Sequence, residues 1–114
     1  MNEATFEWVD IGALREIPRR GSRQVKVNNY AIAIFRTADD RIYAIEDRCP
    51  HLGGPLSQGI VHGTAVTCPL HSWVISVESG KVLGSDTDCV RTIPVRKDNG
   101  RILLRFPFYS EQAA

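Results

Sequence analysis

The stretch of sequence at residues 49–71 reads CPHLGGPLSQGIVHGTAVTCPLH and holds the most informative pattern in the chain. It begins with Cys49-Pro50-His51 and ends with Cys68-Pro69-Leu70-His71, with sixteen residues between the two motifs. Each motif offers one thiol and one imidazole at short spacing, and each contains a proline that stiffens the backbone. Two such loops, lying side by side, can present four ligands to one metal centre.

Two cysteines and two histidines suit either of two metal groups. Zinc accepts a tetrahedral Cys₂His₂ set, but zinc fingers usually pair Cys with Cys and His with His along the chain. Here each loop supplies one of each kind. This arrangement favours a [2Fe–2S] cluster in which one iron takes both thiolates and the other takes both imidazoles. A zinc site and a structural role without metal are the alternatives.

The sequence on either side of these motifs predicts an all-β fold. Alternating or β-branched segments are separated by turn residues, and no window of a dozen residues shows a helical apolar period. Residues 11–18 contain Gly12 and Pro18 and are predicted to form a loop. Asp39-Asp40 and Asp98-Asn99-Gly100 predict tight turns between paired strands. The predicted strands are 6–10, 22–27, 30–37, 41–47, 65–67, 73–77, 90–97 and 101–106.

We expect one domain over residues 1–114, a small antiparallel β sandwich or barrel frame with an inserted loop-rich subdomain. The frame is predicted at 1–43 and 89–110, and the cluster-binding subdomain at about 44–88. All three histidines and six of the nine glycines lie within residues 48–88. Residues 44–88 carry a formal charge of −3 and the rest of the chain +4. An acidic functional end of this kind could steer docking onto a basic partner, or be an ordinary solvated surface.

Composition excludes several classes of protein. The chain has 114 residues and a formal net charge of +1, which lacks the basic excess of nucleic-acid binders. No apolar run approaches the ~20 residues of a membrane span, and the first residues lack the pattern of a signal peptide. Three cysteines argue against a disulfide framework. We therefore expect a cytoplasmic protein with no nucleic-acid or membrane partner.

Three further residues have weaker signals. Cys89 lies far from both motifs in a predicted strand and is expected to be a small buried hydrophobe. His62 is expected in an exposed turn. Trp73 directly follows the second motif and either shields the metal centre from water or belongs to the ordinary core.

With its two motifs and flanking strands, the sequence resembles Rieske [2Fe–2S] proteins over nearly its whole length. Within that superfamily it is most similar to the small subunit of assimilatory NAD(P)H-dependent nitrite reductase, through residues 49–61, 68–73 and 88–95. The resemblance implies a Rieske-type fold and one [2Fe–2S] cluster. It implies that Cys49 and Cys68 hold the inner iron and that His51 and His71 hold the outer one. It also suggests backbone N–H donors to cluster sulfurs at Leu52, Gly53, Gly54, Leu70 and Trp73.

The same resemblance implies a role in electron transfer. The large catalytic subunit of such a nitrite reductase carries flavin, sirohaem and a [4Fe–4S] cluster, and the complex reduces nitrite to ammonium in nitrate assimilation. This chain has no G-x-G-x-x-G nicotinamide motif, so enzyme activity would belong to the complex and not to this chain alone. One alternative is a free ferredoxin that carries electrons from a ferredoxin reductase to a ring-hydroxylating oxygenase. Another is a structural or regulatory subunit whose cluster is off the electron path.

The resemblance also predicts a low reduction potential. High-potential members join their two ligand loops by a disulfide, and the equivalent positions here are Gly54 and Leu70. Those members also place Ser and Tyr hydroxyls near the cluster, where this chain has Trp73 and Ile75. Fewer donors to the reduced cluster mean a lower potential. We expect the low end of the Rieske range, about −150 mV.

Overall fold

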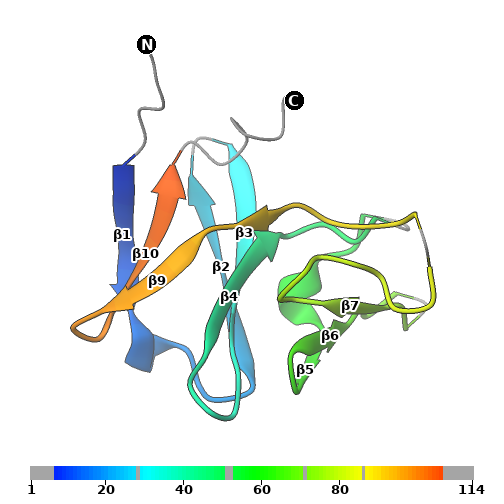
Figure 1. Ribbon diagram of the computed structural model, residues 1–114, viewed down its shortest axis with the longest axis horizontal. Helices are drawn as coiled ribbons and strands as arrows, with labels where there is room; N and C mark the ends of the chain where they lie inside the picture. Colours follow the sequence, from blue (N-terminus) through cyan, green and yellow to red (C-terminus); the bar gives the residue numbers. More distant parts are fainter. Residues whose placement is uncertain (1–6, 28, 51–52, 71, 86, 107–114) are drawn as a thin grey trace.

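The computed structural model describes residues 7–27, 29–50, 53–70, 72–85 and 87–106. These residues form ten short strands and two single turns of 3₁₀ helix, with no α-helix among them (Figure 1). None of the described residues form a helix long and apolar enough to cross a membrane. The strands are β1 (Glu7–Ala13), β2 (Gly21–Val27), β3 (Tyr30–Arg36), β4 (Ile42–Glu46), β5 (Ile60–His62), β6 (Ala65–Thr67), β7 (Val74–Ser76), β8 (Thr92–Ile93), β9 (Val95–Asp98) and β10 (Arg101–Phe106), and the 3₁₀ turns are η1 (Leu14–Glu16) and η2 (Leu56–Gln58).

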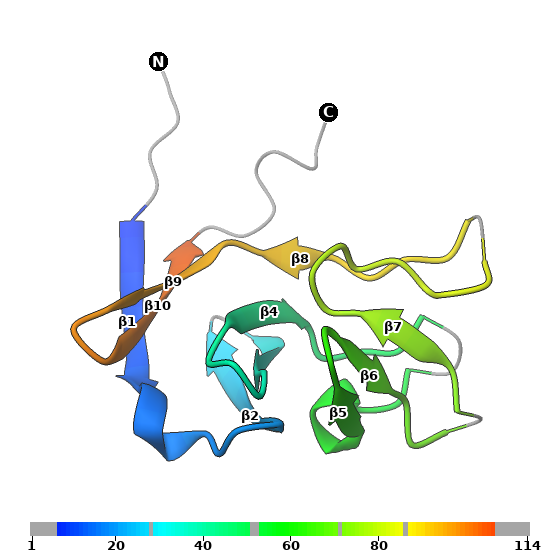
Figure 2. The ribbon, with the colours of Figure 1, turned by 60° about the horizontal axis from the view of Figure 1, so that its bottom comes forward.

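The strands form three antiparallel sheets, which confirms the all-β prediction. Two sheets, ordered β1-β10-β9 and β2-β3-β4-β8, make a frame, and the third, β5-β6-β7, lies beside it (Figures 1 and 2). The third sheet lies within residues 44–88, the range predicted for the inserted subdomain, whereas β4 at the start of that range belongs to the frame. The hairpins predicted at Asp39-Asp40 and at Asp98-Asn99-Gly100 are present, and Asp40 and Asn99 adopt positive φ angles.

Strand β3 separates two hydrophobic cores, and its sequence explains why. Alternate residues of a strand face opposite sides of the sheet. Ile32 and Ile34 face a core that fills the frame, while Ala33 and Phe35 face a second core that joins the frame to β5-β6-β7. This second core contains both Cys49 and Cys68.

The first part of the chain differs from the prediction. Residues 11–13 were predicted to begin a loop, but β1 continues to Ala13 along β10. A β-bulge between Asp10 and Gly12 makes this possible, because Gly12 adopts a φ of +136° and donates its N–H to Asp10 Oδ1 at 3.0 Å. In the sequence, Gly12 suggests that the strand ends, but in the structure it forms a bulge within the strand.

Two other strand assignments need correction. The strand predicted at 90–97 is divided into β8 and β9 at Pro94, because proline lacks an N–H for the ladder and the chain passes there from one sheet to the other. Residues 60–62 were not predicted as a strand but form β5, where Val61 lies opposite Val66. Residues 60–62 directly precede Gly63, and the sequence suggested a turn there instead of a strand.

Candidate metal centre

The first ligand loop runs between β4 and η2 and folds back on itself at Cys49. The Cys49 N–H donates to Gly54 O, and the Gly53 N–H donates to Cys49 O, both at 2.8 Å. Gly53 adopts a φ of +75°, which glycine accepts without strain. These bonds leave the Cys49 side chain 1% exposed and inside the second core.

The second ligand loop closes the hairpin between β6 and β7. The Cys68 N–H donates to Trp73 O at 2.7 Å, which holds the two ends of this loop together. The Leu70 N–H donates to Cys68 Sγ at 3.4 Å, which gives this sulfur a backbone hydrogen bond. The Cys68 side chain is also 1% exposed. Both thiols therefore lie out of water, one in each loop.

The two loops meet at Gly54. A Cβ atom built on this residue would lie 2.8 Å from Leu70 Cδ1 and 3.4 Å from Cys68 Sγ. Any larger residue would press against the second loop, so the missing side chain is what lets the first loop come this close. Gly54 and Leu70, which the resemblance aligned with a disulfide, do lie in contact.

The electrostatics of the chain alone favour a protonated Cys68. Burial raises the pKa of the Cys68 thiol, the Leu70 N–H lowers it, and the neighbouring Cys49 thiol raises it again. A bound metal ion reverses this preference, because its positive charge draws both sulfurs into the thiolate form.

The structure thus brings together a part of the predicted site. Cys49, Cys68, Gly54 and Leu70 lie at one place, with Gly53 in the same loop. His51, Leu52 and His71 lie outside the described residues. Among the residues that are described, no three His, Cys, Asp or Glu side chains converge on one point, so the two cysteines stand as a pair.

Trp73 lies at the border of this pair. It is half-buried and packs against the core that contains both cysteines. It also lines a shallow pocket of about 350 Å³ together with Leu83, which is 58% exposed. Leu70 is exposed as well. The end of the molecule that holds the cysteines therefore presents an apolar surface to solvent.

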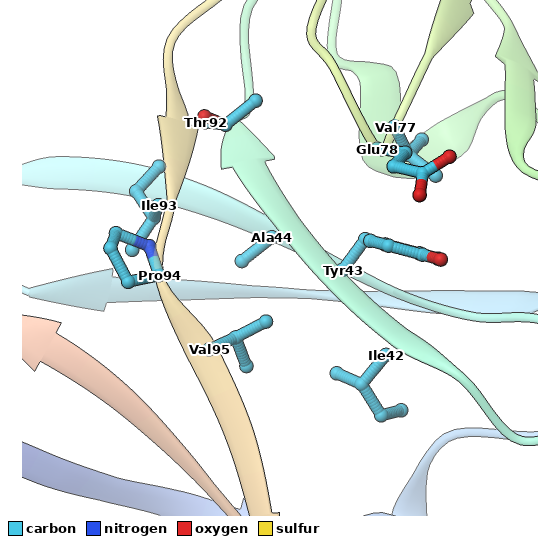
Figure 3. A pocket seen from close by; sticks show the side chains of 9 residues that line it. All are labelled: Ile42, Tyr43, Ala44, Val77, Glu78, Thr92, Ile93, Pro94 and Val95. Atoms are coloured by element: carbon cyan, nitrogen blue, oxygen red, sulfur yellow. The ribbon is translucent and has the colours of Figure 1, made fainter.

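A second pocket, of about 300 Å³, lies between β4 and the segment that joins β8 to β9 (Figure 3). Aliphatic side chains provide most of its lining, and Tyr43 and Glu78 stand on its side nearest to β7. No thiol or imidazole of the described chain borders it. The lining of this pocket therefore gives no reason to place the metal centre there.

The remaining cysteine and histidine lie elsewhere. Cys89 was expected to be buried, but it is exposed. It precedes β8 and pairs with Lys81 in an isolated bridge, so its side chain points outward while the adjacent Val90 points into the core. His62 is exposed as expected, although it lies in β5 and not in a turn, and its Nε2 lies 2.7 Å from Thr67 Oγ1.

The sequence reasoning missed a polar cluster beneath the first loop. Asp47 is 7% exposed and accepts hydrogen bonds from Ser57 and from Gln24 of β2. A charged residue that directly follows a buried strand is a weak signal for such a role. Nothing in the sequence identifies Gln24 or Ser57 as its partners.

The comparison with known families bears on the same two loops. Residues 7–94 match the Rieske [2Fe-2S] domain. The chain belongs to the Rieske [2Fe–2S] family. The match confirms the predicted family, the Rieske fold and the cofactor, which is one Rieske-type [2Fe–2S] cluster. The described residues fit this group, since two buried thiols lie in adjoining loops that the missing Cβ of Gly54 allows to pack closely.

Two groups among the known proteins similar to this Rieske protein bear on its role. The ferredoxin component of naphthalene 1,2-dioxygenase/salicylate 5-hydroxylase systems from Ralstonia sp is 34% identical over 102 residues, which cover 89% of this chain and 97% of that protein. The ferredoxin of carbazole 1,9a-dioxygenase from Nocardioides aromaticivorans is 25% identical with a TM-score of 0.77, covering 85% of this chain and 95% of that one.

The other group has a similar fold. A structure described as the small subunit of an NADH-dependent nitrite reductase from Mycobacterium tuberculosis has a TM-score of 0.82 and 22% identity, covering 90% of this chain and 96% of that one. At this identity the likeness shows the fold alone. The chain is therefore a Rieske electron-transfer protein, similar in sequence to dioxygenase ferredoxins and in fold to a structure described as a nitrite reductase small subunit.

Proposed function

We propose that this chain is the ferredoxin component of an oxygenase system. It would accept one electron from a reductase and deliver it to an oxygenase. The observation that carries this proposal is the 34% identity to a dioxygenase ferredoxin along almost the full length of both proteins. This proposal takes the place of the nitrite reductase role that the sequence alone favoured.

We also propose the ligand set of the cluster. Cys49 and Cys68 would hold the inner iron, and His51 and His71 the outer iron. When bound, the cluster supplies one-electron redox chemistry. The protein contributes the rest: the core around the two cysteines excludes water from the sulfurs, and the Leu70 N–H donates to Cys68 Sγ. Donors to the sulfurs and burial of this kind set the reduction potential.

The apolar end of the molecule suits a transient partner. Leu70 of the second ligand loop and Leu83 are exposed, and Trp73, which packs against the core, lines one pocket with Leu83. An electron-transfer partner must come close to the cluster and then leave, and such encounters use small interfaces. A partner that docks on this surface would meet the second ligand loop first.

The small subunit of a nitrite reductase remains a second candidate. It is favoured by the runs at residues 54–57 and 89–94, which resemble that branch of the family. In that case the partner would be a large subunit that carries flavin, sirohaem and a [4Fe–4S] cluster, and the association would be permanent.

Purification of the tagged chain under mild conditions separates the two candidates. Its native cells are grown once on nitrate and once on an aromatic carbon source, and the proteins that co-elute are identified by mass spectrometry. A chain recovered alone, brown and reducible, supports the ferredoxin, and its reoxidation by the oxygenase of the same cells completes the test. A large co-eluting subunit with sirohaem would contradict the ferredoxin and support the nitrite reductase.

A further inference from the structure

Asp47 and Ser57 stand at the two ends of the first ligand loop. Residues 48–56 lie between them and include Cys49 and the close-packed Gly54. The Asp47 carboxylate accepts the Ser57 N–H at 2.7 Å through Oδ1 and the Ser57 hydroxyl at 2.6 Å through Oδ2. One side chain therefore closes the loop at its base with two hydrogen bonds.

The same two residues fasten the loop to the frame. Gln24 of β2 donates its Nε2–H to Asp47 Oδ2 at 2.6 Å. Ser22, two residues earlier on the same face of β2, donates its hydroxyl to Ser57 O. The Asp47 N–H donates to Ala31 O at 2.9 Å. The base of the loop is thus held to the frame from two sides.

The Asp47 carboxyl group acts in these contacts as a hydrogen-bond acceptor. Three donors point at its two oxygens, one at Oδ1 and two at Oδ2. Within the described part of the chain, no Lys or Arg forms an ion pair with it. At 7% exposure, water screens this charge far less than it screens a surface carboxylate.

We propose that Asp47 is a positioning residue of the metal centre, whose carboxylate closes the first ligand loop onto β2 and whose buried negative charge lowers the reduction potential of the cluster. An added electron makes the cluster more negative, so a nearby negative charge opposes reduction. The donors from Ser57 and Gln24 offset part of that charge. The inference rests on the cluster and not on which partner receives the electron.

The electrostatic part of the proposal predicts shifts of opposite sign. Asp47→Asn removes the charge and keeps the shape, so the midpoint potential of the cluster-loaded protein should rise. Ser57→Ala and Gln24→Leu each remove one donor and leave the charge less offset, so the midpoint should fall. If the substitutions only loosened the loop, the midpoint potential would not shift in opposite directions for the two kinds of change.

Redox titration of the purified, cluster-loaded chain measures these shifts, with the spectrum of the reduced cluster recorded by electron paramagnetic resonance. Asp10→Asn is the matched control. It removes an exposed carboxylate on β1 that pairs with Arg101 of β10, and it should leave the midpoint unchanged. Asp47→Asn should also release iron to a chelator faster, by roughly 10-fold.

An unchanged or lowered midpoint in Asp47→Asn would overturn the proposal, as would a rise in Ser57→Ala. If Asp47→Asn does not take up a cluster, the other two variants decide: lowered midpoints support the proposal, and unchanged or raised ones overturn it. All midpoints are measured on the isolated protein. A failure to couple with an oxygenase would therefore count against the proposed function and leave this inference as it stands.

Discussion

Gly54 of the first ligand loop lies so close to Leu70 of the second that a methyl group on Gly54 would come within 2.8 Å of Leu70 Cδ1. The same methyl group would lie 3.4 Å from Cys68 Sγ. The spacing between the two loops, and with it the spacing of the two buried thiols, depends on this contact. The first two predictions follow from it.

Gly54→Ala should destabilise the protein. The added methyl must displace the Leu70 side chain or part the loops, and overpacking of this kind costs about 1–3 kcal/mol. The free energy of unfolding from denaturant titration measures the loss. Because the crowding atoms belong to the end of a flexible side chain, the double variant with Leu70→Ala should regain most of it. A double variant no more stable than Gly54→Ala would place the strain elsewhere.

A disulfide should form between cysteines placed at positions 54 and 70. The Cβ at position 54 would lie 3.1 Å from Leu70 Cγ, the atom that a cysteine sulfur would replace, which suits the short reach of a disulfide. Closing a loop of about 15 residues stabilises the folded protein by about 3 kcal/mol. Mass spectrometry with and without reductant detects the bond in Gly54→Cys/Leu70→Cys. Either single variant serves as the control and should show none.

Replacement of His71 by cysteine should lower the midpoint potential. If His71 is a ligand of the outer iron, a thiolate in its place adds negative charge to the cluster and disfavours the added electron. Redox titration of the loaded variant measures the shift. His62→Cys is the control, because His62 is exposed and its ring contacts Thr67. Equal midpoints in His71→Cys and the parent protein would exclude His71 as a ligand.

Asp40 should make stability depend on pH in acid. Hydrogen bonds from Arg19 and then Arg36 lower the pKa of Asp40 from 3.8 to about 2. A folded-state pKa below the unfolded one stabilises the fold above the unfolded value, and this contribution disappears as pH falls through the folded value. The stability difference between the parent and Asp40→Asn should therefore shrink between about pH 5 and about pH 2.

Denaturant midpoints of both proteins across this range test the prediction, because loss of the cluster in acid affects both alike. Glu78→Gln, which removes an exposed carboxylate, is the control. A stability difference for Asp40→Asn that stays constant with pH would contradict the linkage.

Cys89 should be the reactive thiol of the loaded protein. It is exposed, whereas Cys49 and Cys68 are buried and are the proposed iron ligands. A thiol-alkylating reagent should therefore modify Cys89 within minutes and leave the visible spectrum unchanged, with peptide mapping to locate the label. Cys89→Ser should abolish the labelling. Label on Cys49 or Cys68 while the spectrum persists would contradict their role as ligands.

Sequence reasoning succeeded where the signal is local. The turn at Asp98-Asn99-Gly100 was predicted because its residues tolerate positive φ, and β6 was predicted with the bounds that it has. It failed where distant segments decide. Gly12 continues a strand because β10 lies beside it, and Cys89 is exposed while its neighbour Val90 is buried in the core. A signal that depends on a partner far along the chain is absent from the residues themselves.

The sequence by itself determined the chemistry of this protein. The residue types at Cys49-Pro50-His51 and Cys68-Pro69-Leu70-His71 are enough to indicate the cluster, because ligand identity and short spacing are local properties. Only the tertiary structure decided what surrounds those residues. Gly54 meets Leu70, and Asp47 joins Ser57 to Gln24, because the sheets and loops pack around a shared core and bring together segments that are far apart in sequence. The sequence therefore names the cofactor, and the packing of β2, β4 and the two loops sets the surroundings that tune it.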